Sequence, residues 1–209
     1  MAYRLNGQTS YAFEGAIFIA GAAIQWLRDG LQIVDRASES EILAKSVPDN
    51  GGVYFVPALT GLGAPYWQPH ARGMISGITR DTKRAHLARA ALEAQAYQTL
   101  DLFSAMVDDC GQEITELRVD GGLVVNRWMC QFLSDMTQVQ VQSPIVTETT
   151  ALGAAYLAAL GAGIYTDLDQ IAGQWQMGAT YHPNMEQAQR DDLFQEWQKN
   201  IRAVISLTA

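Results

Sequence analysis

The segment LRVDGGLVVN, residues 117–126, constrains the fold more than any other part of the chain. A short apolar run ends at the adjacent glycines Gly121 and Gly122, and a pattern with the period of a helix begins at Asn126. This order predicts a buried strand, a glycine turn and a helix. A strand at 139–142 and a helix at 149–162 are predicted next, and such alternation is typical of the α/β class.

The two glycines also suggest a binding function. Glycine lets the backbone approach a ligand closely, and the N-terminus of the next helix offers unpaired N–H groups and a partial positive charge to a phosphate. The segment therefore favours a nucleotide as ligand, although a Gly-Gly pair after a strand is, taken alone, more often only a tight turn. It is neither a GxGxxG fingerprint nor a Walker loop.

Further elements are predicted on both sides of this unit. Asn6-Gly7 separates two alternating runs and predicts a β-hairpin with a type I′ turn. Ser38 and Glu41 have the spacing of a capping box and predict the start of a short helix. The predicted helices are 16–31, 38–47, 81–107, 126–136, 149–162, 167–175 and 186–206, the other predicted strands are 53–57 and 116–119, and residues 58–79 are predicted to form an ordered loop.

Composition limits the classes of function. A chain of 209 residues with 48% hydrophobic residues can form one domain with a buried core. It carries 14 Lys and Arg against 22 Asp and Glu, a net charge of -8, and no basic run, so no nucleic-acid partner is predicted. No apolar run reaches the ~20 residues of a membrane span, so we expect a cytoplasmic protein without one. Cys110 and Cys130 are expected to be reduced thiols.

The sequence offers no metal site and no nucleophile. The three histidines lie far apart without ligand spacing, at His70, His86 and His182. Glu14, Asp120 and Glu148 each stand beside a strand end or a glycine turn, where a carboxylate can serve chemistry. For each of them a structural role, as a cap or turn ligand, is favoured. We therefore assign no catalytic residue to this chain.

Several segments together resemble the FGGY family of carbohydrate kinases, and within it the members that phosphorylate glycerol. The resemblance runs almost from end to end, in the expected order. The segments are YAFEGAIFIAGAAIQWLRDGL (11–31), GVYFVPALTGLGAPYWQPHARGMISGITRDT (52–82), AHLARAALEAQAYQTLDLFSAM (85–106), LRVDGGLVVN (117–126) and ETTALGAAYLAAL (148–160). The second family signature is present as Gly73, Ile75, Gly77 and Ile78, followed by His86, Leu87, Ala90, Ala91, Leu92 and Glu93.

The resemblance implies an actin-like, hexokinase-like ATPase fold of the ribonuclease H type, with a mixed sheet flanked by helices. In this fold two domains close around a nucleotide. The resemblance implies that Gly21, Gln25, Gly122 and Asn126 contact the nucleotide. It further implies ATP and Mg²⁺ as cofactors, and ATP-dependent phosphorylation of glycerol to glycerol 3-phosphate as the reaction of the whole enzyme.

The resemblance also implies that residues 1–209 form a C-terminal nucleotide-binding domain that lacks its first strand and the whole N-terminal domain. In this family the N-terminal domain carries the polyol pocket and the catalytic aspartate. We therefore expect the chain alone to be inactive as a kinase. We also expect a homo-oligomer, formed through the N-terminal hairpin or the uncovered face of the cleft, because unpaired strand edges attract other chains.

Two alternatives stay open. The chain could belong to another FGGY kinase that acts on a pentulose or a related polyol, although the runs TGLGAPYW and QWLRD favour glycerol. It could also be a catalytically inactive nucleotide-binding or assembly module. That alternative rests on Leu123, Val125 and Arg127, which are bulkier or more charged than the residues usual after the glycine pair in this family.

Overall fold

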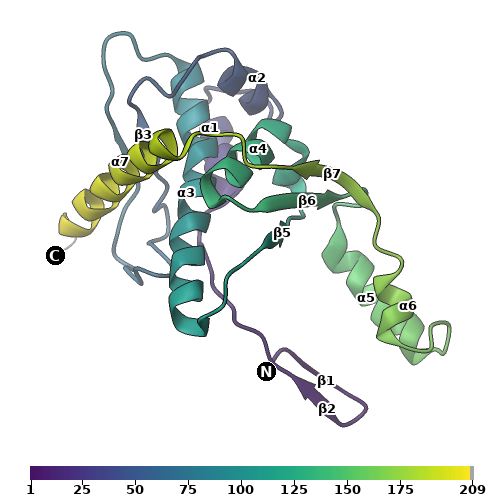
Figure 1. Cartoon of the computed structure of the whole chain (residues 1–209). Coiled ribbons are helices and arrows are strands. Elements are labelled where there is room, and N and C mark those ends of the chain that lie inside the picture. Colours follow the sequence, from purple (N-terminus) through teal and green to yellow (C-terminus); the bar gives the residue numbers. More distant parts are fainter. Residues whose placement is uncertain (208–209) are drawn as a thin grey trace.

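The computed structural model describes residues 1–207 as an α/β protein (Figure 1). The elements in chain order are β1 (Tyr3–Leu5), β2 (Gln8–Ser10), α1 (Ala22–Asp29), α2 (Glu39–Lys45), β3 (Tyr54–Val56), β4 (Met74–Ser76), α3 (Arg84–Cys110), β5 (Glu116–Arg118), the 3₁₀ helix η1 (Gly122–Val125), α4 (Arg127–Thr137), β6 (Gln140–Pro144), α5 (Thr149–Gly161), α6 (Leu168–Ala172), β7 (Met177–Tyr181) and α7 (Gln187–Ser206). No helix among residues 1–207 is both long and apolar enough to cross a membrane.

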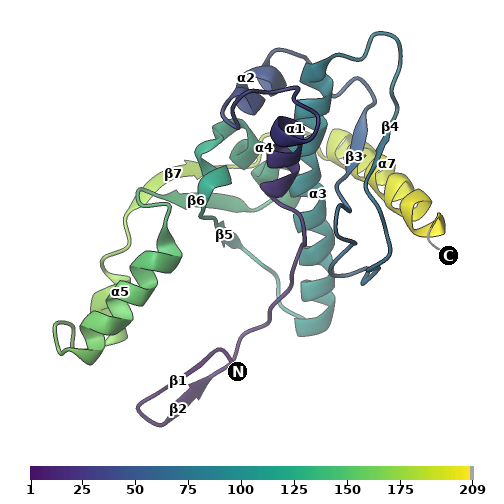
Figure 2. The same cartoon turned by 180° about the vertical axis from the view of Figure 1, so that it is seen from behind.

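The long helix α3 is the centre of the body. Helices α1, α2 and α4 and strand β3 all pack against it, and α7 packs against β3 (Figures 1 and 2). Its buried face is rich in alanine, and Ala88, Ala91 and Ala94 are fully buried. Small side chains let neighbouring elements approach closely, so several helices and a strand can pack against α3 at once.

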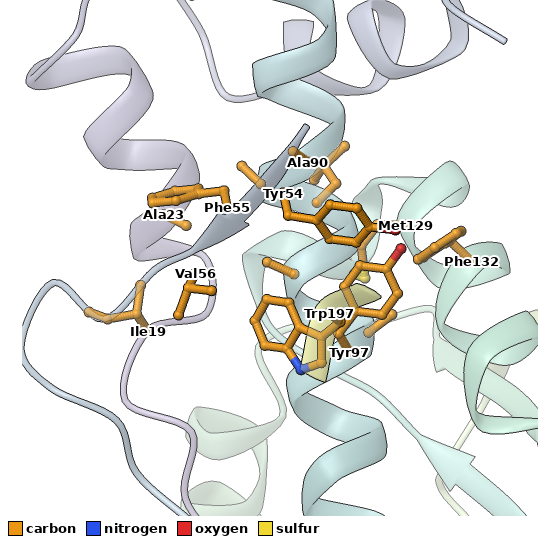
Figure 3. Packing of buried hydrophobic residues seen from close by; sticks show 14 of the residues in the cluster. Ile19, Ala23, Tyr54, Phe55, Val56, Ala90, Tyr97, Met129, Phe132 and Trp197 are labelled. Carbon is orange, nitrogen blue, oxygen red and sulfur yellow. The ribbon is translucent and has the colours of Figure 1, made fainter. Parts of the chain in front are cut away.

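Aromatic residues close the core around the middle of α3 (Figure 3). The ring of Tyr97 stacks on that of Trp197 from α7, with centroids 5.3 Å apart, and meets Phe132 from α4 edge-on at 5.6 Å. Tyr54 from β3 lies on another side of Tyr97, at 6.0 Å. Offset and edge-on aromatic pairs add to the stabilisation from apolar burial, so one residue of α3 fixes three neighbouring elements.

A charged network is buried beside this core. The Glu93 carboxylate accepts hydrogen bonds from Arg89 Nε at 2.8 Å, from Asn50 Nδ2 at 2.8 Å and from the Tyr97 hydroxyl at 3.2 Å. Burial raises the pKa of Glu93, and its hydrogen bonds to Arg89, Asn50 and Tyr97 oppose that rise. The network connects α3 to the turn that precedes β3.

The strands form three small sheets instead of one. β5 pairs in parallel with β6, and β6 pairs antiparallel with β7. β3 and β4 form an antiparallel pair, and β1 and β2 form the hairpin that the sequence predicts, with positive φ angles of 50° at Asn6 and 83° at Gly7. Among residues 1–207, the outer edge of β5 has no strand partner.

Some predicted bounds are wrong at places where a distant segment contacts the chain. The predicted helix 16–31 begins only at Ala22. The backbone oxygen of Ala16 accepts a hydrogen bond of 3.0 Å from the N–H of Ala64, and this contact holds the preceding segment outside the helix.

The start of α2 also differs from the prediction. Ser38 precedes α2 as predicted but forms no side-chain cap, and Glu41 pairs with Lys45 at the other end. The predicted capping box is therefore wrong.

Candidate nucleotide-binding site

The β5–α4 junction has the predicted strand, glycine turn and helix. The N–H of Val119 donates to Gln142 O at 2.9 Å and so continues the pairing of β5 with β6. Gly121 then has φ of 86° and ψ of -178°, a conformation that only glycine adopts readily. Its N–H donates to Thr147 O at 2.9 Å, which fixes the turn against the segment before α5. The backbone direction at this turn is therefore set by glycine.

Gly122 has a different role from Gly121. It begins η1, it is exposed, and a Cβ atom added to it would have no protein atom within 4 Å. The backbone at Gly122 therefore faces open space. A helix N-terminus with an accessible backbone is a favourable environment for an anionic group.

The other predicted glycine, Gly21, lies at the N-cap of α1. Its backbone oxygen accepts from the N–H groups of Ile24 and Gln25, at 3.1 and 3.2 Å, and the space around an added Cβ would again be open. Gln25 is exposed, because Ala23, Ile24 and Leu27 form the buried side of α1. Both predicted residues of α1 are thus accessible from outside.

Asn126 is the predicted site residue whose surroundings differ most from the expectation. It is only 6% exposed, and its side-chain oxygen accepts a hydrogen bond of 2.9 Å from Met129 N as the N-cap of α4. Its Nδ2 donates to Ser40 Oγ of α2 at 3.4 Å. In this structure the amide therefore holds the start of α4 and connects it to α2.

The four predicted residues lie on two helix starts that share one support. Gly21 and Gln25 lie at the start of α1, Gly122 begins η1 and Asn126 caps α4, and both α1 and α4 pack against α3. Both pairs are thus supported by helices that pack on α3. Of the three carboxylates noted in the sequence, Glu148 occupies the N-cap position of α5 without capping it, and Glu14 and Asp120 are exposed.

No metal-binding cluster of three or more His, Cys, Asp or Glu side chains occurs among residues 1–207. Both cysteines are free, with Cys130 buried and Cys110 half-buried. Burial raises the pKa of the Cys130 thiol to about 12, so it is not a reactive thiolate at neutral pH.

A pocket of about 470 Å³ lies next to the junction, between the ends of β5 and β6 and the helices α5 and α6. Arg118 places its guanidinium 4.6 Å from the ring centroid of Trp175, and Tyr156 lines the same pocket. Arg118 could not be predicted from the sequence, because no linear pattern connects it to Trp175. None of the four predicted site residues lines this pocket.

Comparisons with known proteins agree on the family. The model of the C-terminal domain of the FGGY family of carbohydrate kinases matches residues 2–162. The chain is 55% identical over 206 residues to a glycerol kinase of Rhodospirillum rubrum, covering 99% of this chain and 42% of that protein. It is 50% identical over 209 residues to a glycerol kinase of Coxiella burnetii, again covering 42% of that protein.

Solved structures show the same relationship. A Plasmodium falciparum glycerol kinase with ADP superposes with a TM-score of 0.80 at 34% identity, over 90% of this chain and 37% of that one. A xylulose kinase from Lactobacillus acidophilus superposes with a TM-score of 0.79 at 23% identity, over 93% of this chain and 40% of that one, and shares the fold. The chain spans about two fifths of the length of the curated glycerol kinases that it matches, for example 42% of the Rhodospirillum rubrum protein. It belongs to the FGGY family of carbohydrate kinases and corresponds to its C-terminal domain.

Proposed function

We propose that this chain is the nucleotide-binding C-terminal domain of a glycerol kinase, which transfers a phosphoryl group from ATP to glycerol and forms glycerol 3-phosphate. The observation that carries the proposal is the 55% identity to a glycerol kinase across 99% of the chain. The match to a structure that contains ADP, at a TM-score of 0.80, supports the use of an adenine nucleotide.

Within this proposal, Gly122 and Gly21 leave room for the nucleotide to approach the backbone at two helix starts. The open space at both positions supports that role. Gln25 offers an exposed amide from α1. Asn126 contributes by holding the start of α4 in place, because its side-chain oxygen caps the helix and its Nδ2 donates to Ser40 Oγ.

We propose that Mg²⁺ is held by the phosphates of the nucleotide and not by side chains of this chain. Residues 1–207 hold no cluster of carboxylates that would form a dedicated site, and Mg²⁺ in kinases commonly takes substrate phosphates and water as ligands. When bound, the ion neutralises charge on the phosphates. We further propose that the polyol pocket and the catalytic base come from an N-terminal domain, the part of the relatives that this chain does not match.

Calorimetric titration of the chain with ADP tests the nucleotide site. Gly122→Val places a side chain into the open space at the helix start, so we expect ADP affinity to fall about tenfold or more while the fold is unchanged. Gly161→Val is the matched control, because Gly161 also has open space around it but lies at the end of α5. Equal ADP affinity of the two variants would contradict the assigned role of Gly122.

The acceptor is tested with the whole enzyme. We expect glycerol to be phosphorylated with a higher kcat/KM than a pentulose, and Gly122→Val to weaken nucleotide binding far more than glycerol binding. The 209-residue chain alone, given ATP and glycerol, should form no ADP. A whole enzyme that prefers a pentulose would favour the other kinases of the family instead. A whole enzyme without ATP turnover would favour an inactive binding module, the alternative based on Leu123, Val125 and Arg127.

A further inference from the structure

The start of α4 is held from two neighbouring helices, α2 and α3, which both pack against α4 (Figures 1 and 2). Oγ of Ser40 in α2 accepts a hydrogen bond of 3.4 Å from Nδ2 of Asn126, the N-cap residue of α4. Arg89 of α3 places its guanidinium 5.0 Å from the ring centroid of Trp128, in the first turn of α4. Ser40 is 1% exposed and Asn126 is 6% exposed, so water competes little with the hydrogen bond between them.

The hydroxyl group of Ser40 determines how the Asn126 amide is oriented. Its proton is donated to the backbone oxygen of Ala37 at 2.6 Å, so Oγ can meet Asn126 only as an acceptor. The amide nitrogen of Asn126 must therefore face Ser40, and the amide oxygen then accepts from the N–H of Met129 at 2.9 Å. With the amide turned over, two acceptors would meet at Ser40 and two donors at Met129. Ser40 thus selects the orientation in which Asn126 caps α4.

Arg89 holds the same helix turn through an aromatic ring. Its Nε donates to Glu93 at 2.8 Å within α3, and its Nη1 donates to Val47 O at 2.8 Å, just after α2. These two bonds fix the guanidinium over the ring of Trp128. Only 14% of the Arg89 side chain is exposed, and a cation attracts an aromatic face more strongly where water is largely excluded. Arg89 therefore joins α3 and the end of α2 to the first turn of α4.

The glycine turn is connected to this helix start by hydrogen bonds. The backbone oxygen of Val124 in η1 accepts a bond of 3.4 Å from Sγ of Cys130 in α4. The N–H of Val124 donates to Gly121 O at 3.3 Å, and Val124 itself is buried. A displacement at the start of α4 would therefore change the position of the open backbone at Gly122.

We propose that Ser40 and Arg89 are positioning residues of the nucleotide site, an inference that rests on the function proposed above for Gly122. Each acts through a residue at the start of α4 and not by touching the nucleotide. With either contact removed, the nucleotide has to order the helix start when it binds, and the free energy of that ordering lowers its affinity. Glycerol binding should change far less, because the proposed polyol pocket belongs to another domain.

Nucleotide affinity of the whole enzyme tests the role of Ser40. In Ser40→Ala we expect the Kd of ADP, measured by calorimetry, and the KM of ATP to rise about threefold or more, with a much smaller change in the KM of glycerol. Ser46→Ala is the matched control, because Ser46 is exposed at the end of α2 and its hydroxyl donates to Leu43 O of the same helix. We expect the control to keep both nucleotide constants. A general loss of stability would not separate the two substrates in this way.

A double variant tests whether Ser40 acts through Asn126. In the Asn126→Ala background the hydrogen bond between the two side chains is already absent, so adding Ser40→Ala should raise the Kd of ADP no further. Equal effects of Ser40→Ala in both backgrounds would overturn the proposed route. An unchanged Kd in Ser40→Ala alone would overturn the positioning role of Ser40.

Variants of Trp128 test the role of Arg89 and leave the buried pair of Arg89 with Glu93 in place. Trp128→Phe keeps a ring face for the guanidinium, and Trp128→Leu does not. We expect the Kd of ADP in Trp128→Leu to be about threefold or more above that in Trp128→Phe. Urea unfolding shows whether both variants are folded under the conditions of the titration. Equal ADP affinity of two folded variants would overturn the role of Arg89.

Gly122→Val separates this inference from the function on which it rests. If Gly122→Val loses ADP affinity as expected, while Ser40→Ala and Trp128→Leu keep it, only the positioning role is wrong. If Gly122→Val binds ADP as tightly as the unmodified enzyme, the nucleotide site itself is wrong and both proposals are overturned.

Discussion

The indole Nε1–H of Trp197 donates a hydrogen bond of 2.7 Å to Oδ2 of Asp101. It joins α7 to α3 at a place where Trp197 is fully buried and Asp101 is 5% exposed. Burial raises the pKa of Asp101 to about 6, and hydrogen bonds from Trp197, Tyr66 and Gln198 oppose the rise. The attachment of the last helix to the core therefore contains a carboxyl group that titrates in the mildly acidic range.

This carboxyl group predicts how stability depends on pH. The folded chain binds the Asp101 proton more tightly than the unfolded chain, whose pKa is near the ordinary 3.8. Its contribution to stability is therefore complete below about pH 4 and is lost as the pH rises through about 6, with a magnitude on the order of 3 kcal/mol. In Asp101→Asn we expect a smaller fall of the free energy of unfolding over this range, measured by urea denaturation at several pH values. Asp109→Asn, at an exposed position of the same helix, should keep the pH dependence of the unmodified chain.

The buried Glu93 network predicts a large effect of a single truncation. Glu93→Ala removes the acceptor of Arg89 Nε and of Asn50 Nδ2 in a buried place, and of its hydrogen bonds within residues 1–207 Arg89 keeps only the one to Val47 O. We expect the free energy of unfolding to fall by about 3–5 kcal/mol, as measured for broken buried ion pairs. Glu41→Ala removes the exposed pair with Lys45 and should cost about 1 kcal/mol or less. Similar losses in both variants, measured by denaturant titration, would show that the buried network contributes little.

Substitutions at the two adjacent glycines should destabilise the chain to different degrees. Gly121→Ala forces an L-residue into φ of 86° with ψ of -178°, which costs about 1–3 kcal/mol. Gly122→Ala adds a methyl group in open space and should change the free energy of unfolding by less than about 0.5 kcal/mol. Thermal unfolding of the two variants checks this difference. Equal destabilisation would mean that the turn does not depend on the backbone angles of Gly121.

The C-terminal residues of two helices have positive φ angles, and substitutions there should change stability in opposite directions. Gln138 ends α4 with a positive φ of 57°, and Gly111 ends α3 with φ of 64°. Because glycine adopts this conformation without strain, Gln138→Gly should stabilise the chain by up to about 1 kcal/mol, reduced by loss of the Gln138 bond to Asp135 O. Gly111→Ala should destabilise it by about 1 kcal/mol. Midpoints of urea unfolding measure both changes, and a loss of stability in Gln138→Gly would mean that the side-chain bond outweighs the backbone strain.

The sequence predicts most elements of this fold because their signals are local. The Asn6-Gly7 turn, the strand before Gly121 and the periodic pattern of α7 each depend on residues close to one another in the chain, and the structure confirms all three elements. Strands β4 and β7 were not predicted. Each is short and becomes a strand by pairing with β3 or β6, so no local pattern identifies it.

In the candidate site, too, local features could be predicted from the sequence and contacts between distant segments could not. The glycine turn follows from the two adjacent glycines after a strand, and Gly122 is exposed in that turn. The cap that Asn126 forms, and its bond to Ser40, depend on the packing of α2 against α4, which the sequence does not display. In the same way, the apolar period runs on through Ile17 and Ala20, but the helix cannot extend there because Ala16 is bonded to Ala64.

Helix α5 carries no charged residue on any side, from Thr149 to Gly161, and none of its residues is buried. A helix with one polar and one apolar side can pack in only one rotation about its axis, because the wrong rotation exposes apolar surface. α5 has no such preference in its sequence, so rotations about its own axis differ little in apolar burial. Its orientation is set instead by single contacts, such as the edge-on packing of Tyr156 against Tyr165 with ring centroids 5.9 Å apart. A change at either tyrosine would therefore remove one of the contacts that, together with the half-buried Leu152 and Leu160, hold this rotation.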